Sequence, residues 1–254
     1  MNKTWRFLDF ESEDPYVNMA IEEAIARKVG EGETPNTLRL WRNKNAVVIG
    51  NFQSLKQEVN MQECARLGVC LVRRFTGGGA VYHDLGNLNY SMSIVKDDPL
   101  VVRDPIQVYS YLSRFVVEAI RLIGVNSEFK PPSEISVNGL KISGSACSMK
   151  WGTVFLHGSI LVDTDLEALS RVLCATDICE DHPYVRSVKR DVTCLKRELG
   201  RDVTMVEVKN ALEHEMQETY GLTLVRRRMT RSEMQLTKKL FLEKYSTTEW
   251  NARY

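Results

Sequence analysis

The chain has 254 residues, of which 43% are hydrophobic and 26% are charged, a composition that excludes a disordered or fibrous protein. Because 34 lysines and arginines balance 33 aspartates and glutamates, the chain lacks the overall positive charge of a nucleic-acid-binding protein. No apolar run approaches the roughly 20 residues of a membrane-spanning helix, and the N-terminus does not resemble a signal peptide, so neither nucleic acid nor membrane is an expected partner.

The cysteines indicate a cellular compartment. None of the six forms a C-x-x-C pair, the spacing typical of redox and metal sites. We therefore expect free thiols in a reducing, cytoplasmic setting, because disulfides are rare there. The six residues are Cys64, Cys70, Cys147, Cys174, Cys179 and Cys194.

The first predicted elements are a helix and a pair of strands. Asp14 followed by Pro15 is typical of a helix start, and apolar residues follow at helical spacing until Gly30 ends the helix. Residues 37–41 and 46–49 have the composition of β-strands. Since only four polar residues separate them, we expect these strands to form a hairpin.

The next elements lead into and away from three consecutive glycines. A short helix over 61–67 should end at Gly68, and a buried strand over 69–73 delivers the chain to the glycines at 77–79. Residues 89–95 alternate between apolar and polar side chains, which predicts another strand.

An Asn-Gly pair predicts a β-hairpin over residues 135–142. In a two-residue turn Ile135 would face Ile142, and Lys141 would lie on the opposite face from the apolar pairs. The ammonium group of Lys141 is thus expected to be presented rather than buried.

The remaining elements complete the fold prediction. They are a helix over 106–123, a strand over 155–162 and helices over 166–173, 205–220 and 231–245. Because strands dominate the middle of the chain and helices its end, the pattern favours an α+β fold over a regular βαβ repeat. No repeat or linker divides the chain, so we expect a single domain over residues 1–254.

The segment around the triple glycine has the features of an anion-binding loop. Consecutive glycines allow the backbone to approach a ligand closely, and Arg73 and Arg74 add forked cationic donors just upstream. No Gly-Lys-Ser/Thr follows, and the strand-like residues 80–82 do not open a helix, so neither a Walker A loop nor a dinucleotide-binding loop is expected. Taken alone, a triple glycine more often indicates a flexible turn with solvated arginines than a binding loop.

Two further segments contain candidate catalytic groups. Lys141 is followed by small residues and could stabilise negative charge on a phosphate and on an acyl carbonyl. His157 lies in an apolar strand and could face a ligand. Each residue alone also fits a structural role, a surface lysine in one case and a hydrogen-bonded core histidine in the other.

The combination of segments resembles the lipoate-protein ligase family. Residues 73–87 resemble the glycine-rich signature of that family, and residues 141–146 resemble its lysine motif. The resemblance runs in order from about residue 5 to residue 251. Further similar segments are Asn18-Met19-Ala20, Leu40-Trp41-Arg42, residues 47–53, His157-Gly158-Ser159 and Glu249-Trp250-Asn251.

The resemblance implies a fold of the biotin and lipoate ligase catalytic-domain type, with central mixed or antiparallel sheets flanked by helices. It also implies a two-step reaction. The carboxylate of lipoate, or of octanoate, attacks the α-phosphate of ATP with Mg²⁺ present, and a lysine of a carrier domain then takes the acyl group from the adenylate.

By position in the motifs, the resemblance assigns roles to single residues. Lys141 is the implied catalytic residue, because it matches the lysine that contacts both adenylate and carboxyl group. The implied nucleotide-binding residues are Arg74, Gly79, Ala80, Val81, Tyr82 and Lys141. The implied lipoate-binding residues are Gly77, Gly78, His83, Lys141 and His157.

The chain departs from the family pattern in three places. Ser133-Glu134 replaces the usual Asn-Asp before the lysine hairpin, which leaves Glu134 as a candidate metal ligand and the metal site otherwise unassigned. Cys194 replaces the asparagine of a Val-Thr-Asn segment. The chain stops soon after Asn251, where many ligases continue into an accessory domain, so we expect either a separate accessory subunit or a protein that performs only the transfer step.

Other functions are compatible with parts of the sequence. An octanoyltransferase of the same family needs a cysteine nucleophile, and Cys147 is the candidate nearest to the lysine motif. A non-catalytic lipoate-binding or carrier-binding subunit is a second alternative, although Arg74 and Lys141 argue against it. A biotin ligase arranges its adenylate loop differently.

The expected protein partner is a lipoyl carrier domain. It could belong to the acyltransferase subunit of an oxo-acid dehydrogenase or to a glycine-cleavage carrier. The basic residues 226–228 could dock such a domain if it is acidic, with a solvated charged face as the structural alternative.

Overall fold

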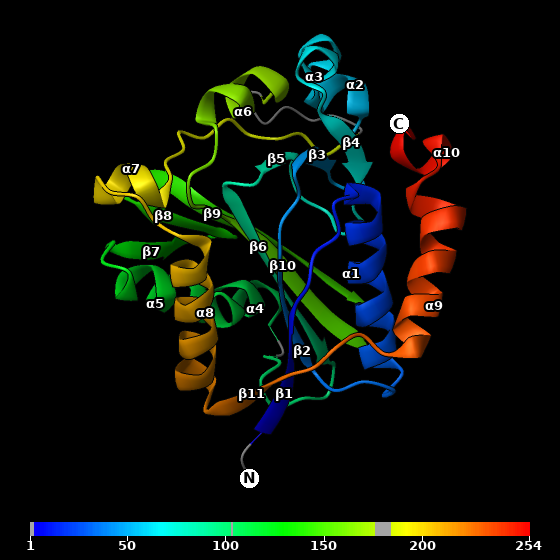
Figure 1. Cartoon of the computed structure of the whole chain (residues 1–254), viewed down its shortest axis with the longest axis vertical. Helices are drawn as coiled ribbons and strands as arrows, with labels where there is room; N and C mark the ends of the chain where they lie inside the picture. Colours follow the sequence, from blue (N-terminus) through cyan, green and yellow to red (C-terminus); the bar gives the residue numbers. More distant parts are fainter. Residues whose placement is uncertain (1–2, 103, 176–183) are drawn as a thin grey trace.

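The computed structural model describes residues 3–102, 104–175 and 184–254, and places them in two sheets with flanking helices (Figure 1). The strands are β1 (Lys3–Asp9), β2 (Thr37–Trp41), β3 (Asn45–Ile49), β4 (Cys70–Arg73), β5 (Val81–Asp84), β6 (Asn87–Val95), β7 (Ser127–Lys130), β8 (Glu134–Val137), β9 (Leu140–Lys150), β10 (Thr153–Leu161) and β11 (Leu222–Arg226). Cys179 lies outside the described residues.

The helices cover both faces of the larger sheet. They are α1 (Pro15–Gly30), α2 (Leu55–Glu58), α3 (Met61–Leu67), α4 (Pro105–Leu112), α5 (Arg114–Leu122), α6 (Leu166–Val172), α7 (Leu195–Leu199), α8 (Met205–Tyr220), α9 (Arg231–Leu240), the π-helical turn η1 (Phe241–Tyr245) and α10 (Thr248–Asn251). In Figure 1, α1 and α9 lie side by side at the right, and α5 and α8 lie at the left.

The two sheets have different topologies. The eight-stranded sheet has the order β11-β1-β2-β6-β10-β9-β8-β7, with β1 parallel to both of its neighbours and the other pairs antiparallel. The three-stranded sheet has the order β4-β3-β5. This arrangement confirms the predicted α+β class and its mixed sheets.

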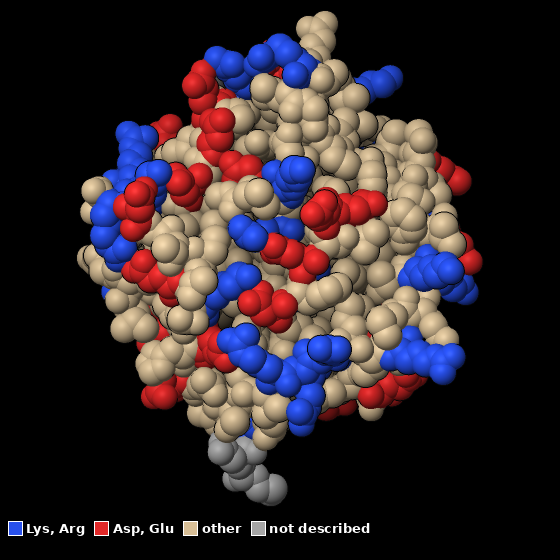
Figure 2. Space-filling model, viewed as in Figure 1, with Lys and Arg blue, Asp and Glu red and all other residues tan. Residues whose placement is uncertain are grey.

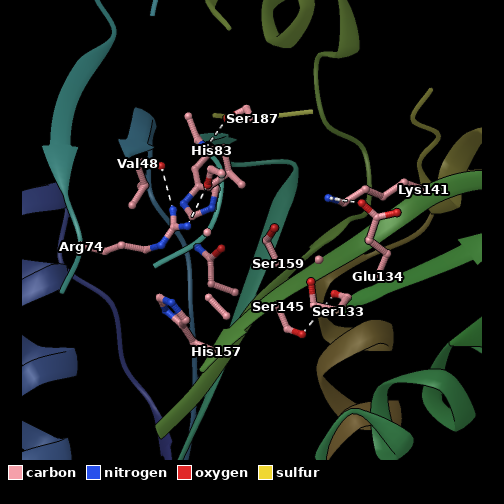
Figure 3. A pocket seen from close by; sticks show the side chains of 18 of the residues that line it. Val48, Arg74, His83, Ser133, Glu134, Lys141, Ser145, His157, Ser159 and Ser187 are labelled. Atoms are coloured by element: carbon pink, nitrogen blue, oxygen red, sulfur yellow. Dashed lines mark hydrogen bonds and ion pairs between the residues drawn. The ribbon is translucent and has the colours of Figure 1, made fainter. Parts of the chain in front are cut away.

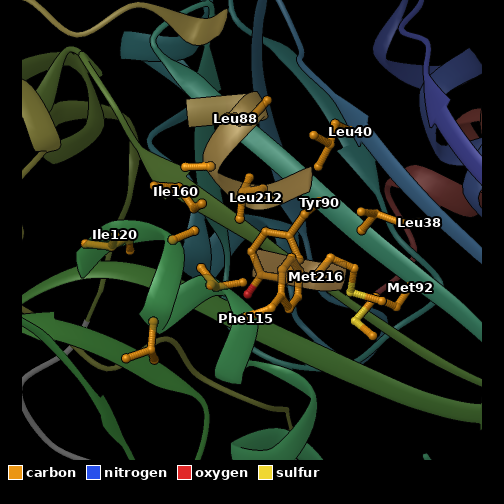
Figure 4. Packing of buried hydrophobic residues seen from close by; sticks show 14 of the residues in the cluster. Leu38, Leu40, Leu88, Tyr90, Met92, Phe115, Ile120, Ile160, Leu212 and Met216 are labelled. Atoms are coloured by element: carbon orange, nitrogen blue, oxygen red, sulfur yellow. The ribbon is translucent and has the colours of Figure 1, made fainter. Parts of the chain in front are cut away.

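The main core lies between the eight-stranded sheet and helices α5 and α8 (Figure 4). Strand β6 shows why it forms on that side, because Leu88, Tyr90 and Met92 alternate with polar residues and all point into this core. Phe115 of α5 packs edge-on against Tyr90, with 5.6 Å between ring centroids. The polar residues of β6 consequently face the other side of the sheet, where Asn87 contacts Tyr82 of β5 and Ser91 contacts Glu22 of α1.

Helix caps explain why several predicted boundaries are confirmed. The Asp14 carboxylate accepts hydrogen bonds from the backbone N–H groups of Tyr16 and Val17 at the start of α1. Gly68 and Gly221 end α3 and α8 with positive φ angles of 64° and 59°, a conformation that glycine adopts without strain.

The predicted hairpin of residues 37–49 is wrong, because β2 and β3 belong to different sheets. Both strands are buried over nearly their whole length, so each needs neighbours on both sides. Asn43 lies in the connection, where its buried amide contacts Asn18 and His83. The chain therefore crosses between the sheets at this point.

Two other predictions need correction. The single helix expected over 106–123 is divided into α4 and α5 at Ser113. In the β8–β9 hairpin Ile135 pairs with Ser143 rather than with Ile142, because an irregularity shifts the register by one residue. Ser136 still pairs with Lys141, as the Asn-Gly turn predicts.

The surface is electrically mixed. Figure 2 shows basic and acidic side chains interspersed over one face, in keeping with the small net charge. Arg226 of the basic cluster is ion-paired with Glu213, whereas Arg227 and Arg228 are exposed. Within the ranges that the structure describes, no helix is long and apolar enough to cross a bilayer.

Candidate functional site

A row of residues that crosses four strands forms the floor of the site. Trp41 on β2 pairs with Asn89 on β6, Asn89 pairs with Ser159 on β10, and Ser159 pairs with Gly144 on β9. Directly paired residues point to the same face of a sheet. All four line one cavity of about 320 Å³ on the face opposite the main core.

The glycine segment lies across this floor as a wall of the cavity. Gly78 has a φ of +87°, which disfavours any other residue, and a Cβ on Gly50 would lie 2.1 Å from the Gly78 carbonyl oxygen. The Arg74 guanidinium donates to the carbonyl oxygens of Val48 (3.0 Å), Gly77 (2.7 Å) and Gly79 (2.8 Å). Arg74 therefore holds the loop in shape.

Arg73 is the last residue of β4, and its side chain points away from the side that Arg74 occupies. Its guanidinium donates to the carbonyl oxygens of Gly50 (2.8 Å), Gln53 (2.7 Å) and Arg253 (2.6 Å). The indole N–H of Trp250 in turn donates to the Arg73 carbonyl oxygen at 2.9 Å. The interpretation of Arg73 as an anion-binding donor is therefore wrong, because this residue secures the C-terminal segment.

Lys141 lines the same cavity as Gly78 and Gly79, and Figure 3 shows its side chain next to Glu134. Its side chain is 29% exposed, and its Nζ is 3.3 Å from Glu134 Oε1, which also accepts from Arg190 at 3.1 Å. The lysine passes over Gly144, where an added Cβ would be 2.9 Å from Nζ. The ammonium is thus presented to the cavity, as the hairpin register predicts.

A second cavity of about 730 Å³ adjoins the first, and the residues that line both include Ala80, Val81, Lys141 and Gly144. Its other walls combine apolar side chains with the charged Lys189, Asp191 and Arg197. The leucines that line it are Leu140, Leu161, Leu166, Leu169 and Leu173. The site as a whole therefore joins a small chamber to a larger one, with the glycine loop and Lys141 at their junction.

Two neutral histidines line the small cavity. Burial lowers the pKa of His83 to about 3 and also lowers the pKa of His157. His83 Nδ1 is 3.2 Å from the Asn43 amide, and His157 Nε2 is 2.7 Å from Thr76 Oγ1. Both imidazoles are therefore uncharged at neutral pH.

The depressed histidine pKa values predict a pH-dependent stability. Below pH 6.5 an unfolded His83 binds a proton, whereas the folded residue does not until about pH 3, so the free energy of unfolding should fall as the pH drops from 7 towards 4. Urea unfolding at pH 7 and pH 5 measures this loss. We expect the loss to be smaller in His83→Gln. An equal loss in both proteins would contradict the assignment of a neutral His83.

Ser187 completes the wall of the small cavity, and the sequence analysis missed it. Its Oγ accepts hydrogen bonds from the Ala80 backbone N–H (2.8 Å) and from the Gln53 amide (3.0 Å). Ser187 follows a stretch without periodicity, so no sequence signal pointed to it. Asn89, Ser159 and Arg190 also line the cavity without having been predicted.

The structure brings most of the predicted site residues together. Lining the small cavity are Arg74, Gly78, Gly79, Ala80, Val81, His83, Lys141 and His157. Tyr82 lines the second cavity, whereas Gly77 lines neither and faces Phe52. Cys147 also lies outside both cavities, and burial raises the pKa of its thiol to about 11, which disfavours the thiolate at neutral pH.

Glu134 does not form a metal site with its surroundings. Its carboxylate already faces two cations, Lys141 and Arg190. Over residues 3–102, 104–175 and 184–254, the structure groups no three His, Cys, Asp or Glu side chains that could hold a metal ion. A metal bound by protein side chains alone therefore does not fit here.

Comparison with known proteins gives the family. The family of the lipoyl protein ligase A/B catalytic domain matches residues 14–217. The chain is 34% identical to lipoate-protein ligase A subunit 1 of Thermoplasma acidophilum, over 92% of this chain and 91% of the relative. It is also 29% identical to the octanoyltransferase LipM of Clostridioides difficile, over 98% of each protein.

Solved structures show the same likeness. A T. acidophilum lipoate-protein ligase with bound lipoic acid is similar over the full length of both chains, with a TM-score of 0.84 and 32% identity. A lipoate-protein ligase A bound with ATP is similar over 99% of both chains (TM-score 0.83, 33% identity). A bipartite ligase from T. acidophilum, described with its E2 lipoyl domain, covers 98% of this chain and 96% of its own (TM-score 0.85, 32% identity).

Proposed function

Because the chain belongs to the lipoyl protein ligase A/B catalytic-domain family, we propose that it activates lipoate with ATP and transfers the lipoyl group to a lysine of a carrier domain. One observation supports this proposal above the others. Lys141 and the glycine segment line the same cavity, so the ammonium and the glycine loop border one space for a ligand. Such an arrangement suits an acyl phosphate, which concentrates negative charge.

The two cavities suit the two halves of lipoyl-adenylate. The small cavity would take the lipoyl chain between Trp41, His83 and His157, and the larger one would take the nucleoside beside Val81 and Tyr82. Their junction then holds the carboxylate of lipoate against the α-phosphate of ATP. The carboxylate oxygen attacks the α-phosphorus, and pyrophosphate leaves with the electrons of the broken P–O bond.

In the transfer step, the amine of the carrier lysine attacks the acyl carbon of the adenylate. The C–N bond forms first and gives a tetrahedral intermediate, and the amine nitrogen loses a proton to solvent. The bond from the acyl carbon to the phosphate oxygen then breaks, and AMP leaves with its electrons. The Lys141 ammonium would offset the negative charge that develops first on the carbonyl oxygen and then on the phosphate. Arg74 would act through the loop that it holds rather than through direct contact with the phosphate.

Magnesium would enter with the nucleotide. Mg²⁺ commonly binds through phosphate oxygens and water with few protein ligands. Since Glu134 is already ion-paired, we assign the ion to the phosphates of ATP as part of the substrate and derive no step from a protein-bound metal.

An octanoyltransferase is the second candidate function, because LipM is similar to this chain along nearly its full length. That activity needs a nucleophilic thiolate. No cysteine in the described parts of the chain lines either cavity, and Cys147 packs beside the main core. The geometry therefore favours the ligase.

The proposed partners are a lipoyl carrier domain and a separate accessory subunit. The proposal of an accessory subunit follows from the similarity to subunit 1 and to a bipartite ligase of T. acidophilum. The carrier would be the acyltransferase of an oxo-acid dehydrogenase or a glycine-cleavage carrier. Exposed Arg227 and Arg228 offer an acidic carrier a favourable charge.

A carrier-mass assay tests the proposed function. The protein is incubated with MgATP, lipoate and an apo-carrier domain, with and without a candidate accessory subunit, and the carrier is followed by mass spectrometry. We expect a gain of one lipoyl group that requires ATP. A gain from octanoyl-carrier without ATP that is lost in Cys147→Ser would select the octanoyltransferase instead, and binding without any transfer would indicate a non-catalytic subunit.

A further inference from the structure

We propose that Asn89 makes this protein selective for lipoate over an unsubstituted eight-carbon acid, by donating a hydrogen bond from its amide to a sulfur of the dithiolane ring. This inference rests on the proposed function, because it assumes that the acyl chain occupies the small cavity. It concerns the end of the substrate far from the carboxylate that Lys141 would hold.

The Asn89 side chain is almost completely buried, with an exposed fraction of 1%. Neither its Nδ2 nor its Oδ1 has a hydrogen-bond partner among the residues that the structure describes. Asn87, two residues earlier on the same face of β6, is fully engaged: it donates to the Tyr82 carbonyl oxygen at 3.0 Å and accepts from Thr164. A buried amide without partners is costly unless a ligand supplies them.

The position of Asn89 in the sheet indicates that it would contact the distal end of the acyl chain. Neighbouring strands are about 4.8 Å apart, so Asn89 lies roughly 10 Å from Gly144, two strands away along the row that forms the cavity floor. Lys141 passes over Gly144 and would hold the carboxyl end. An extended eight-carbon chain that starts there reaches Asn89 with its distal carbons, where lipoate bears its two sulfur atoms.

The surroundings of Asn89 suit a dithiolane ring. The next residue along the row is Trp41, whose ring offers the sulfur–aromatic contact that is favourable in proteins. Met19 and Val48 add apolar surface, and the two histidines there are neutral. The Asn89 amide and the Trp41 indole N–H beside it both lack a partner among the described residues, and an octanoyl chain would leave the Asn89 amide unpaired. Such a mismatch lowers affinity for the analogue.

Direct binding of free acids tests the proposal. Isothermal titration calorimetry of the intact protein would compare lipoate with 5-cyclopentylpentanoate, which has the same ring shape without sulfur, and with octanoate. We expect wild-type protein to bind lipoate about tenfold more tightly than the cyclopentyl acid, as one modest hydrogen bond allows. In Asn89→Leu this ratio should approach one, because lipoate loses its donor and the cyclopentyl acid gains apolar contact.

Stability measurements provide a second criterion. Because leucine replaces an unpartnered amide, Asn89→Leu should raise the thermal unfolding midpoint of the ligand-free protein, whereas Asn87→Leu should lower it. Asn89→Ala serves as a smaller variant if leucine hinders binding of all three acids. An unchanged ratio of affinities in both Asn89 variants would overturn the proposal and leave the amide as a water-binding group only.

The outcome separates this inference from the proposed function. Acid binding needs neither ATP nor carrier, so a protein that binds lipoate selectively but never forms an adenylate would refute the ligase and keep the role of Asn89. A protein that lipoylates its carrier but binds all three acids equally would keep the ligase and refute the role of Asn89.

Discussion

Replacing Lys141 with alanine is expected to lower the rate of lipoyl-adenylate formation by about a hundredfold or more. This size is typical for the loss of one donor that stabilises developing negative charge. The ammonium is partly exposed and its ion pair is with Glu134, so its removal should leave the fold intact. ATP–pyrophosphate exchange in the presence of lipoate measures the first step, and the mass of the carrier domain measures the second.

A lysine on the same strand provides the matched control. Lys150 ends β9 and is exposed, well away from both cavities, so Lys150→Ala should retain wild-type exchange and transfer. Thermal unfolding midpoints of both variants should match that of the wild type. If Lys141→Ala kept full exchange activity with an unchanged midpoint, the catalytic role of Lys141 would be refuted.

Local sequence patterns predicted the helix boundaries correctly where a capping residue or a terminal glycine sets the end of the helix. The Asp14 cap and the glycines at the ends of α3 and α8 fix helix boundaries through backbone geometry alone. The separation of β2 from β3 was not predictable in this way. Both strands are apolar, and a short connection is as compatible with a crossing between sheets as with a hairpin.

The site was predicted where a motif marked it and missed where tertiary packing created it. Residues 73–87 and Lys141 are distant in sequence, and only the packing of the small sheet over the large one joins them in one cavity. The alternation in β6 did contain a signal for Asn89, since its polar residues recur at every second position of a buried strand. Interpreting that signal required knowledge of which face the site occupies.

The pair Arg73 and Arg74 shows what simple geometry adds to a motif. Adjacent residues in extended backbone point to opposite sides. Two neighbouring arginines at the end of a strand therefore cannot both face one ligand, and the structure directs Arg73 to the C-terminal segment and Arg74 to the glycine loop.

Replacing Arg74 with alanine is expected to lower the free energy of unfolding by about 3 kcal/mol, because buried carbonyl oxygens would lose their donor. ATP affinity should fall by about a hundredfold as the glycine loop loses its shape, a cost in keeping with small misplacements of binding groups. Burial lowers the pKa of Arg74 to about 10, so the guanidinium remains charged at neutral pH. Urea unfolding and titration of ATP measure the two effects.

Arg74→Lys distinguishes a loop-organising residue from a simple phosphate contact. A lysine keeps the positive charge but cannot donate in the fork that reaches Val48, Gly77 and Gly79 together. If Arg74 acts through the loop, the lysine variant should lose ATP affinity nearly as severely as the alanine variant. Recovery of most of the ATP affinity in Arg74→Lys would instead mean that the charge itself binds the nucleotide. A lysine supplies a point charge that is enough for a phosphate, but it does not restore three separate carbonyl contacts.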